Sequence, residues 1–231
     1  MDFNMKKTLC SALISTLFLF SPGVSASVNI TSKEEKDYKE IKSAKIVYSG
    51  DITAIKVSQL MASINDININ APQVKEIALY INSGGGSMDA GYMGAEAVKG
   101  SGIPIRTINA AMTGSSATLI YCAAEKRTLL PSATFYFHSA SIGNQGLDEI
   151  TPNHLAYLSR NINNANQIFR DAYKDCLKLP NSELDKILYS NDHDLLLRSA
   201  EAINKGLAQG VEKGIPPTDI SYYITDETDK N

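Results

Sequence analysis

Short apolar runs alternate with longer amphipathic stretches along most of this chain. The short runs are followed by turn residues and predict buried strands at 45–49, 76–81, 103–108 and 134–137. The longer stretches carry apolar residues three or four positions apart and predict helices at 53–65, 88–99, 118–124, 152–179, 180–187 and 198–206. Strands and helices that alternate with short connections predict one α/β domain with a mostly parallel sheet.

The two ends of the chain depart from this alternation. Residues 1–26 contain two lysines, an apolar run and a small-residue stretch that ends at Ala26, which is typical of a secretory signal peptide. An uncleaved membrane anchor is the alternative, although the apolar run is short for a membrane span. Beyond residue 26 we expect a polar N-terminal arm at 27–43, the folded domain at 44–217 and a polar C-terminal tail at 218–231. The mature protein would be periplasmic or secreted, and free of the membrane once the signal is cleaved.

Composition narrows the classes of partner and cofactor. The chain has 231 residues, 43% of them apolar, and a formal net charge of -3, so nothing indicates binding to nucleic acid. The histidines are few and far apart, so we expect no metal site. Export would leave Cys122 and Cys176 in an oxidising compartment, where they could form a disulfide. The sequence is equally compatible with two buried free thiols.

A glycine-rich segment, NSGGGS at 82–87, joins a predicted strand to a predicted helix. It matches neither the dinucleotide pattern G-x-G-x-x-G nor the phosphate-binding pattern G-x-x-x-x-G-K-[ST], so we expect no nucleotide cofactor. Glycines at this position allow the backbone to approach another group closely or to adopt positive φ.

A second turn of small residues, TGSSA at 113–117, also joins a strand to a helix. A serine at such a junction stands clear of the backbone beside unpaired helix amides, although a small-residue packing turn is the simpler interpretation. Ser115 here would be a nucleophile, His138 after a strand its base, and Asp194 in a polar loop the group that orients the base. The amides of Gly86 and Ser116 would form an oxyanion hole.

Four motifs in this order carry a family resemblance. They are YINSGGG at 80–86 with AG at 90–91, GSSATLI at 114–120, PSATFYFH at 131–138, and Asp194 with EA at 201–202 and GL at 206–207. Over about residues 44–212 the chain resembles the proteolytic subunit of the Clp protease and its relatives in the crotonase-like superfamily. The resemblance implies a single domain of repeated β-β-α units, a serine peptidase without cofactor or metal, and a homo-oligomer.

The family pattern also implies roles for individual residues, with two alternatives left open. Aligned to this chain without a gap, the family pattern places its nucleophile at Ser115. Ser116 is then the residue whose amide forms the oxyanion hole together with the amide of Gly86. Exchanging the roles of the two serines is the first alternative. Asp192 in place of Asp194 is the second.

These residues support three hypotheses of function. The first is an exported serine endopeptidase that hydrolyses peptides or unfolded polypeptides, with no ATPase partner evident because export removes it from ATP. The second is a catalytically inactive, secreted binding or assembly subunit of the same fold. The third is an acyl-thioester enzyme, which export argues against because coenzyme A thioesters are intracellular.

Overall fold

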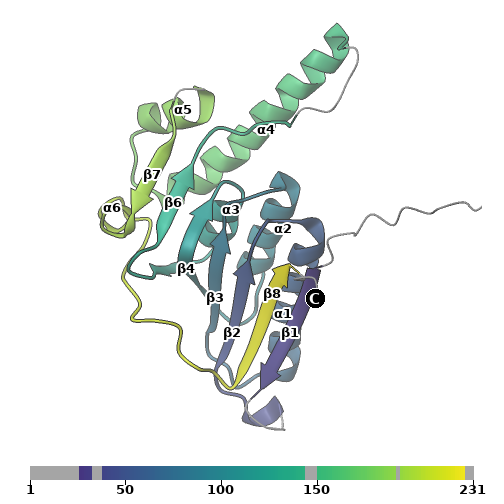
Figure 1. The fold of residues 1–231 in the computed structure, drawn as a ribbon, viewed down its shortest axis with the longest axis vertical. Helices are drawn as coiled ribbons and strands as arrows, with labels where there is room; N and C mark the ends of the chain where they lie inside the picture. The colour runs from purple at the N-terminus through teal and green to yellow at the C-terminus, as the bar shows by residue number, and fades with distance from the viewer. Residues whose placement is uncertain (1–25, 33–37, 144–149, 191–192, 227–231) are drawn as a thin grey trace, which may run out of the picture.

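The computed structural model describes residues 26–32, 38–143, 150–190 and 193–226, which form one large sheet with helices packed against it (Figure 1). The strands are β1 (Ala26–Ser32), β2 (Ala44–Ser49), β3 (Ile77–Ser83), β4 (Ile105–Gly114), β5 (Lys126–Leu129), β6 (Thr134–Phe137), β7 (Leu195–Arg198) and β8 (Ile220–Asp226). The helices are the 3-10 turn η1 (Tyr38–Glu40) and α1 (Ala54–Asn70), α2 (Met88–Lys99), α3 (Ala117–Cys122), α4 (Pro152–Cys176), α5 (Asn181–Tyr189) and α6 (Ser199–Asn204).

The sheet runs in the order β1-β8-β2-β3-β4-β6-β7, and β5 also pairs with β4. Strands β8, β2, β3, β4 and β6 are parallel to one another, whereas β1 and β7 are antiparallel at the two edges. Helices α1, α2 and α3 lie along one face of this sheet (Figure 1). The predicted α/β class with a mostly parallel sheet is confirmed.

Both ends of the folded chain contain strands where the sequence predicted only a polar arm and a polar tail. Strand β8 lies between β1 and β2, and it buries the alternating residues Ile220, Tyr222 and Ile224. The prediction was wrong here because a strand with one buried face needs an apolar residue only at every second position. The predicted signal peptide lies outside the described residues except for Ala26, the first residue of β1.

Two further strands of four residues were missed, whereas the equally short β6 was predicted from its aromatic and β-branched sequence TFYF. Strand β5 begins with two charged residues, and β7 has the sequence LLLR between two predicted polar or helical segments. Neither is long enough to show a period of its own, so their pairing with β4 and β6 depends on the tertiary structure. Strand β7 matters most because it begins directly after Asp194.

A disulfide connects the end of α3 to the end of α4. Cys122 and Cys176 are 54 positions apart in sequence, and their Cα atoms are 5.5 Å apart. The sequence left this pairing open. The bond fastens α4 to the body of the domain at the helix's C-terminal end.

The rest of α4 extends well beyond the sheet (Figure 1). Its C-terminal half buries Phe169 and Tyr173, whereas Leu155 and Tyr157 in its N-terminal half are 61% and 54% exposed. The apolar stripe predicted along this helix is therefore covered over only half its length. Within the ranges that the structure describes, no helix has the length and apolar character needed to cross a membrane.

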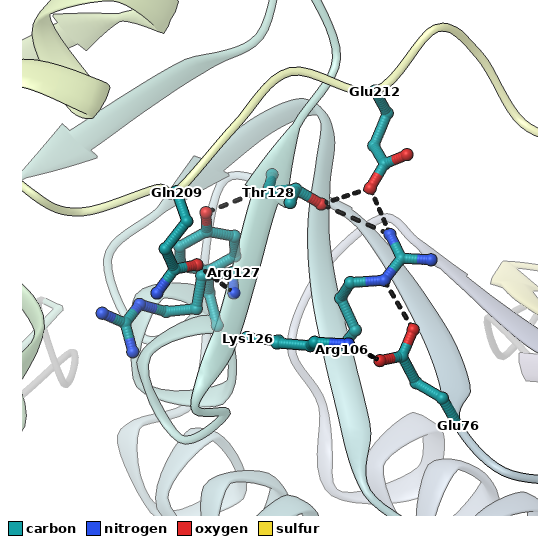
Figure 2. A network of polar contacts seen from close by, with 8 residues as sticks. Glu76, Arg106, Lys126, Arg127, Thr128, Gln209 and Glu212 are labelled. Atoms are coloured by element: carbon teal, nitrogen blue, oxygen red, sulfur yellow. Dashed lines mark hydrogen bonds and ion pairs between the residues drawn. The ribbon is translucent and has the colours of Figure 1, made fainter.

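A network of charged side chains ties the segment after α6 to the middle of the sheet (Figure 2). Arg106 on β4 lies between Glu76, at 2.8 Å from its Nε, and Glu212, with which it also forms an ion pair. Lys126 Nζ is 2.7 Å from the other carboxylate oxygen of Glu76, and Thr128 donates to Glu212 at 2.8 Å. Burial of the Glu76 carboxyl raises its pKa, but the hydrogen bonds from Arg106 and Lys126 outweigh this effect and leave the pKa lowered.

This network predicts that part of the stability is lost in acid. A lowered pKa in the folded state means that Glu76 stabilises the protein above its ordinary pKa, and that this contribution disappears as the pH falls through the folded value. Glu76→Gln should therefore cost about 1 kcal/mol near neutral pH and almost nothing near pH 3 in thermal unfolding. Glu96→Gln removes a carboxylate from an exposed pair with Lys99 and should have little effect at either pH. An equal loss for Glu76→Gln at both pH values would contradict the assignment.

Candidate active site

The predicted catalytic residues follow the carboxyl ends of neighbouring strands. Ser115 directly follows β4, His138 directly follows β6, and the glycine-rich loop follows β3. Because these strands are parallel, all three segments lie at one edge of the sheet. The backbone joins them as well, since Ser115 N donates to the carbonyl oxygen of Tyr136 on β6 at 3.0 Å.

Ser115 has a backbone conformation that is uncommon for a residue with a side chain. Its φ is 49°, and in the described ranges it is the one non-glycine residue with positive φ. The turn is closed by the Thr118 amide, which donates to Ser115 O at 2.9 Å. Strained conformations of this kind are concentrated at functional sites, where they aim a side chain. Ser115 is also partly exposed.

The adjacent Ser116 has the opposite environment. It is 0% exposed, and its hydroxyl is buried without a hydrogen-bond partner among the described residues. A Cβ on Gly91 of α2 would lie 2.8 Å from the Cβ of Ser116, so the side chain of Ser116 is enclosed by α2. Ser115 is therefore partly accessible to solvent, whereas the hydroxyl of Ser116 is not.

The glycine-rich loop lies directly against Ser115. Gly85 has φ 115°, and a Cβ on it would be 2.5 Å from Ser115 Cβ. Gly86 has φ 147°, and a Cβ there would be 2.4 Å from the carbonyl oxygen of Ile52. Neither Gly86 N nor Ser116 N donates to another protein group in the described parts of the chain. Gly86 is exposed, so its amide is open to an incoming oxygen, whereas Ser116 as a whole is buried in this structure.

The pairing of β6 with β7 brings His138 and Asp194 opposite each other. Phe137 pairs with Leu195 in the antiparallel ladder, so one further step places His138 across from Asp194. This proximity depends on β7, the strand that the sequence did not predict. The alternative, Asp192, lies outside the described residues.

The hydrogen bonds of a catalytic triad are nevertheless not formed in this arrangement. His138 Nδ1 is 2.7 Å from the backbone oxygen of Ser139, and Asp194 Oδ2 accepts from the hydroxyl of Tyr136 at 2.9 Å. The hydrogen bond to Asp194 also raises the pKa of Tyr136. Sequence reasoning missed Tyr136, although its position two residues before His138 places both on the same face of β6.

A hollow of about 680 Å³ adjoins the glycine loop and the N-terminal half of α4. Its lining mixes apolar and uncharged polar side chains with the carboxylate of Asp89, and includes Gly86, Met88, Ile142, Tyr157, Leu158 and Asn161. Such a space beside the free amide of Gly86 could hold a substrate side chain. No group of three or more histidine, cysteine, aspartate and glutamate residues in the described ranges is arranged to hold a metal ion.

Comparison with known proteins agrees with this class of α/β fold. The Clp protease family model matches residues 31–214. The chain is 30% identical over 135 residues to the Clp protease proteolytic subunit of Dehalococcoides mccartyi, covering 58% of this chain and 64% of that subunit, which is less than two thirds of its length. It is 27% identical over 187 residues to proteolytic subunit 3 of Rhizobium meliloti, covering 79% and 90%.

A solved structure has the same fold. A mutant ClpP1 of Listeria monocytogenes superimposes with a TM-score of 0.59 at 18% identity, covering 74% of this chain and 91% of its own. The protein is thus an α/β chain with a serine at the carboxyl edge of a mostly parallel sheet. It belongs to the Clp protease family.

Proposed function

We propose that this protein is an exported serine endopeptidase that hydrolyses peptides or unfolded polypeptides. The observation that carries the proposal is the position of Ser115, partly exposed at positive φ and in contact with a glycine loop that has a free amide. Membership of the Clp protease family supports the reaction class.

The proposed mechanism assigns a defined role to each group. Ser115 Oγ attacks the carbonyl carbon of the scissile peptide while His138 Nε2 takes its proton, and the amides of Gly86 and Ser116 stabilise the resulting oxyanion. His138 then gives the proton to the leaving amine as the C–N bond breaks, and water hydrolyses the acyl-enzyme by the same route. Asp194 would hold the imidazole. The contact of His138 Nδ1 with the carbonyl oxygen of Ser139 suits the role of His138 as the base. A carbonyl oxygen can only accept, so Nδ1 carries the proton and Nε2 is left free to accept one from Ser115.

The setting of the enzyme is also part of the proposal. The disulfide between Cys122 and Cys176 is typical of proteins in oxidising compartments, which supports export to the periplasm or beyond. An exported enzyme would act without an ATP-driven partner on substrates that are already unfolded or short. The exposed apolar half of α4, with Leu155 and Tyr157, would pack against other copies in a homo-oligomer.

The test is the labelling of the purified protein by a fluorophosphonate, together with hydrolysis of a fluorophore-labelled unfolded protein in the absence of ATP. We expect both reactions, and we expect His138→Ala to abolish both. A folded protein that shows neither, as monomer or as oligomer, would favour the inactive binding or assembly subunit. Hydrolysis of an acyl-thioester in preference to peptides would favour the third hypothesis.

The glycine loop offers a matched pair of variants. Gly85→Ala adds a methyl group at positive φ, 2.5 Å from Ser115 Cβ, so Ser115 must move. Displacing a reacting group by about 1 Å can cost on the order of a hundredfold in rate, and we expect a loss of that size in the rate of labelling. Gly84→Ala meets nothing within 4 Å and should retain the wild-type rate. Equal rates for the two variants would show that Gly85 does not position Ser115.

A further inference from the structure

Tyr136 contacts all three residues that the proposed function assigns to the triad. Its carbonyl oxygen accepts from Ser115 N at 3.0 Å. Its ring is stacked on the ring of His138, with centroids 5.2 Å apart and an interplanar angle of 28°. Its hydroxyl donates to Asp194 Oδ2 at 2.9 Å. No role in the proposed mechanism accounts for the hydroxyl.

The β6–β7 ladder explains why the hydroxyl matters. Tyr136 pairs with Leu196, so Asp194 lies directly across from His138 and diagonally across from Tyr136 on the same face. A long aromatic side chain can reach a diagonal neighbour, whereas a directly opposite pair is closer. The register continued one step beyond the last pair, Phe137 with Leu195, therefore puts two hydrogen-bond donors near Asp194, and in this structure Asp194 is bonded to the diagonal one.

His138 is correspondingly paired with another acceptor. Its Nδ1 contacts the backbone oxygen of Ser139, the next residue in the chain. The proton on Nδ1 therefore has an acceptor that is not Asp194. Forming the triad requires the Tyr136–Asp194 and His138–Ser139 contacts to be exchanged for one between His138 and Asp194. Both contacts are near the surface and involve single hydrogen bonds, so the exchange needs no change in the core.

We propose that Tyr136 is a positioning residue whose hydroxyl holds Asp194 away from His138 and so limits the fraction of molecules with a formed triad. This inference rests on the proposed peptidase function for its kinetic consequence. Removing the hydroxyl while keeping the ring and the backbone should leave His138 as the remaining donor for Asp194.

The test is Tyr136→Phe, which retains the stacking on His138 and the carbonyl that binds Ser115 N. Loss of one competing hydrogen bond should raise kcat and the rate constant of fluorophosphonate labelling about two- to tenfold, with KM unchanged. Proton NMR of the purified protein should show a far-downfield imidazole N–H signal, typical of a histidine bonded to a carboxylate, stronger in Tyr136→Phe than in the wild type. Asp194→Asn in the same background should remove that signal. Tyr189→Phe, on the exposed surface of α5, should behave as the wild type.

The outcomes separate this inference from the proposed function. A lower kcat in Tyr136→Phe, or an unchanged kcat with an unchanged N–H signal, would overturn the role of Tyr136 while leaving the peptidase in place. A stronger N–H signal in a protein that is never labelled would support the positioning role and overturn the peptidase, because the signal does not depend on turnover.

Discussion

Ser115→Ala is expected to abolish labelling by fluorophosphonates and to lower peptide hydrolysis by at least about a thousandfold. The reason is that no other hydroxyl occupies this strand end with access to a substrate: Ser116 is fully buried, and Thr118 bonds back to Ser115 O. The melting temperature should change little, since only the hydroxyl oxygen is removed. The positive φ of residue 115 costs a similar free energy for serine and for alanine. The measurement is the rate of labelling and hydrolysis together with the melting temperature.

Ser116→Ala is the matched control for this prediction. It removes a buried hydroxyl that has no hydrogen-bond partner in the described structure, so stability should be equal or slightly higher. The amide of Ser116 remains, and with it the proposed oxyanion hole, so labelling should continue at a rate close to that of the wild type. Loss of labelling in Ser116→Ala but not in Ser115→Ala would exchange the roles of the two serines.

Replacing Cys122 and Cys176 by serine is expected to give the largest loss of stability. A bond that closes a loop of 54 positions restricts the unfolded chain and is worth about 4 kcal/mol by the chain-entropy estimate. For a domain of this size that corresponds to a fall in melting temperature on the order of 10 °C. Because the bond holds the base of α4, any assembly through the exposed half of this helix should weaken as well.

Reductant supplies the control for the disulfide. A thiol reductant should lower the melting temperature of the wild type towards that of the double serine variant and leave the variant itself unchanged. Two free thiols in the purified wild-type protein, together with a melting temperature insensitive to reductant, would contradict the pairing. The single variants Cys122→Ser and Cys176→Ser should each unfold close to the double variant, since either one removes the bond.

The sequence predicted the centre of the fold well because buried parallel strands and their crossover helices have strong local patterns. The apolar run that became β3 and the helical spacing of α2 were recognised within one or two residues of their bounds. Weaker local patterns explain the errors: β5 begins with two charged residues, the three leucines of β7 fit a strand or a helix equally well, and β8 mixes polar with apolar residues. Pairing with a distant partner, rather than local preference, makes these segments strands.

In the candidate site, likewise, local sequence decides some features of the structure and the meeting of distant segments decides the others. The sequence by itself determined that His138 follows a strand end and that glycines line a strand-to-helix turn, because turn chemistry is local. That Ser115 directly follows a strand was decided by the structure, because β4 runs to Gly114 and the predicted strand ended at residue 108. Only the tertiary structure decided which serine is accessible, since the burial of Ser116 depends on the approach of α2. It also decided the partner of Asp194, because the pairing of β6 with β7 brings that carboxylate to the hydroxyl of Tyr136, and register between strands is set by the sheet as a whole.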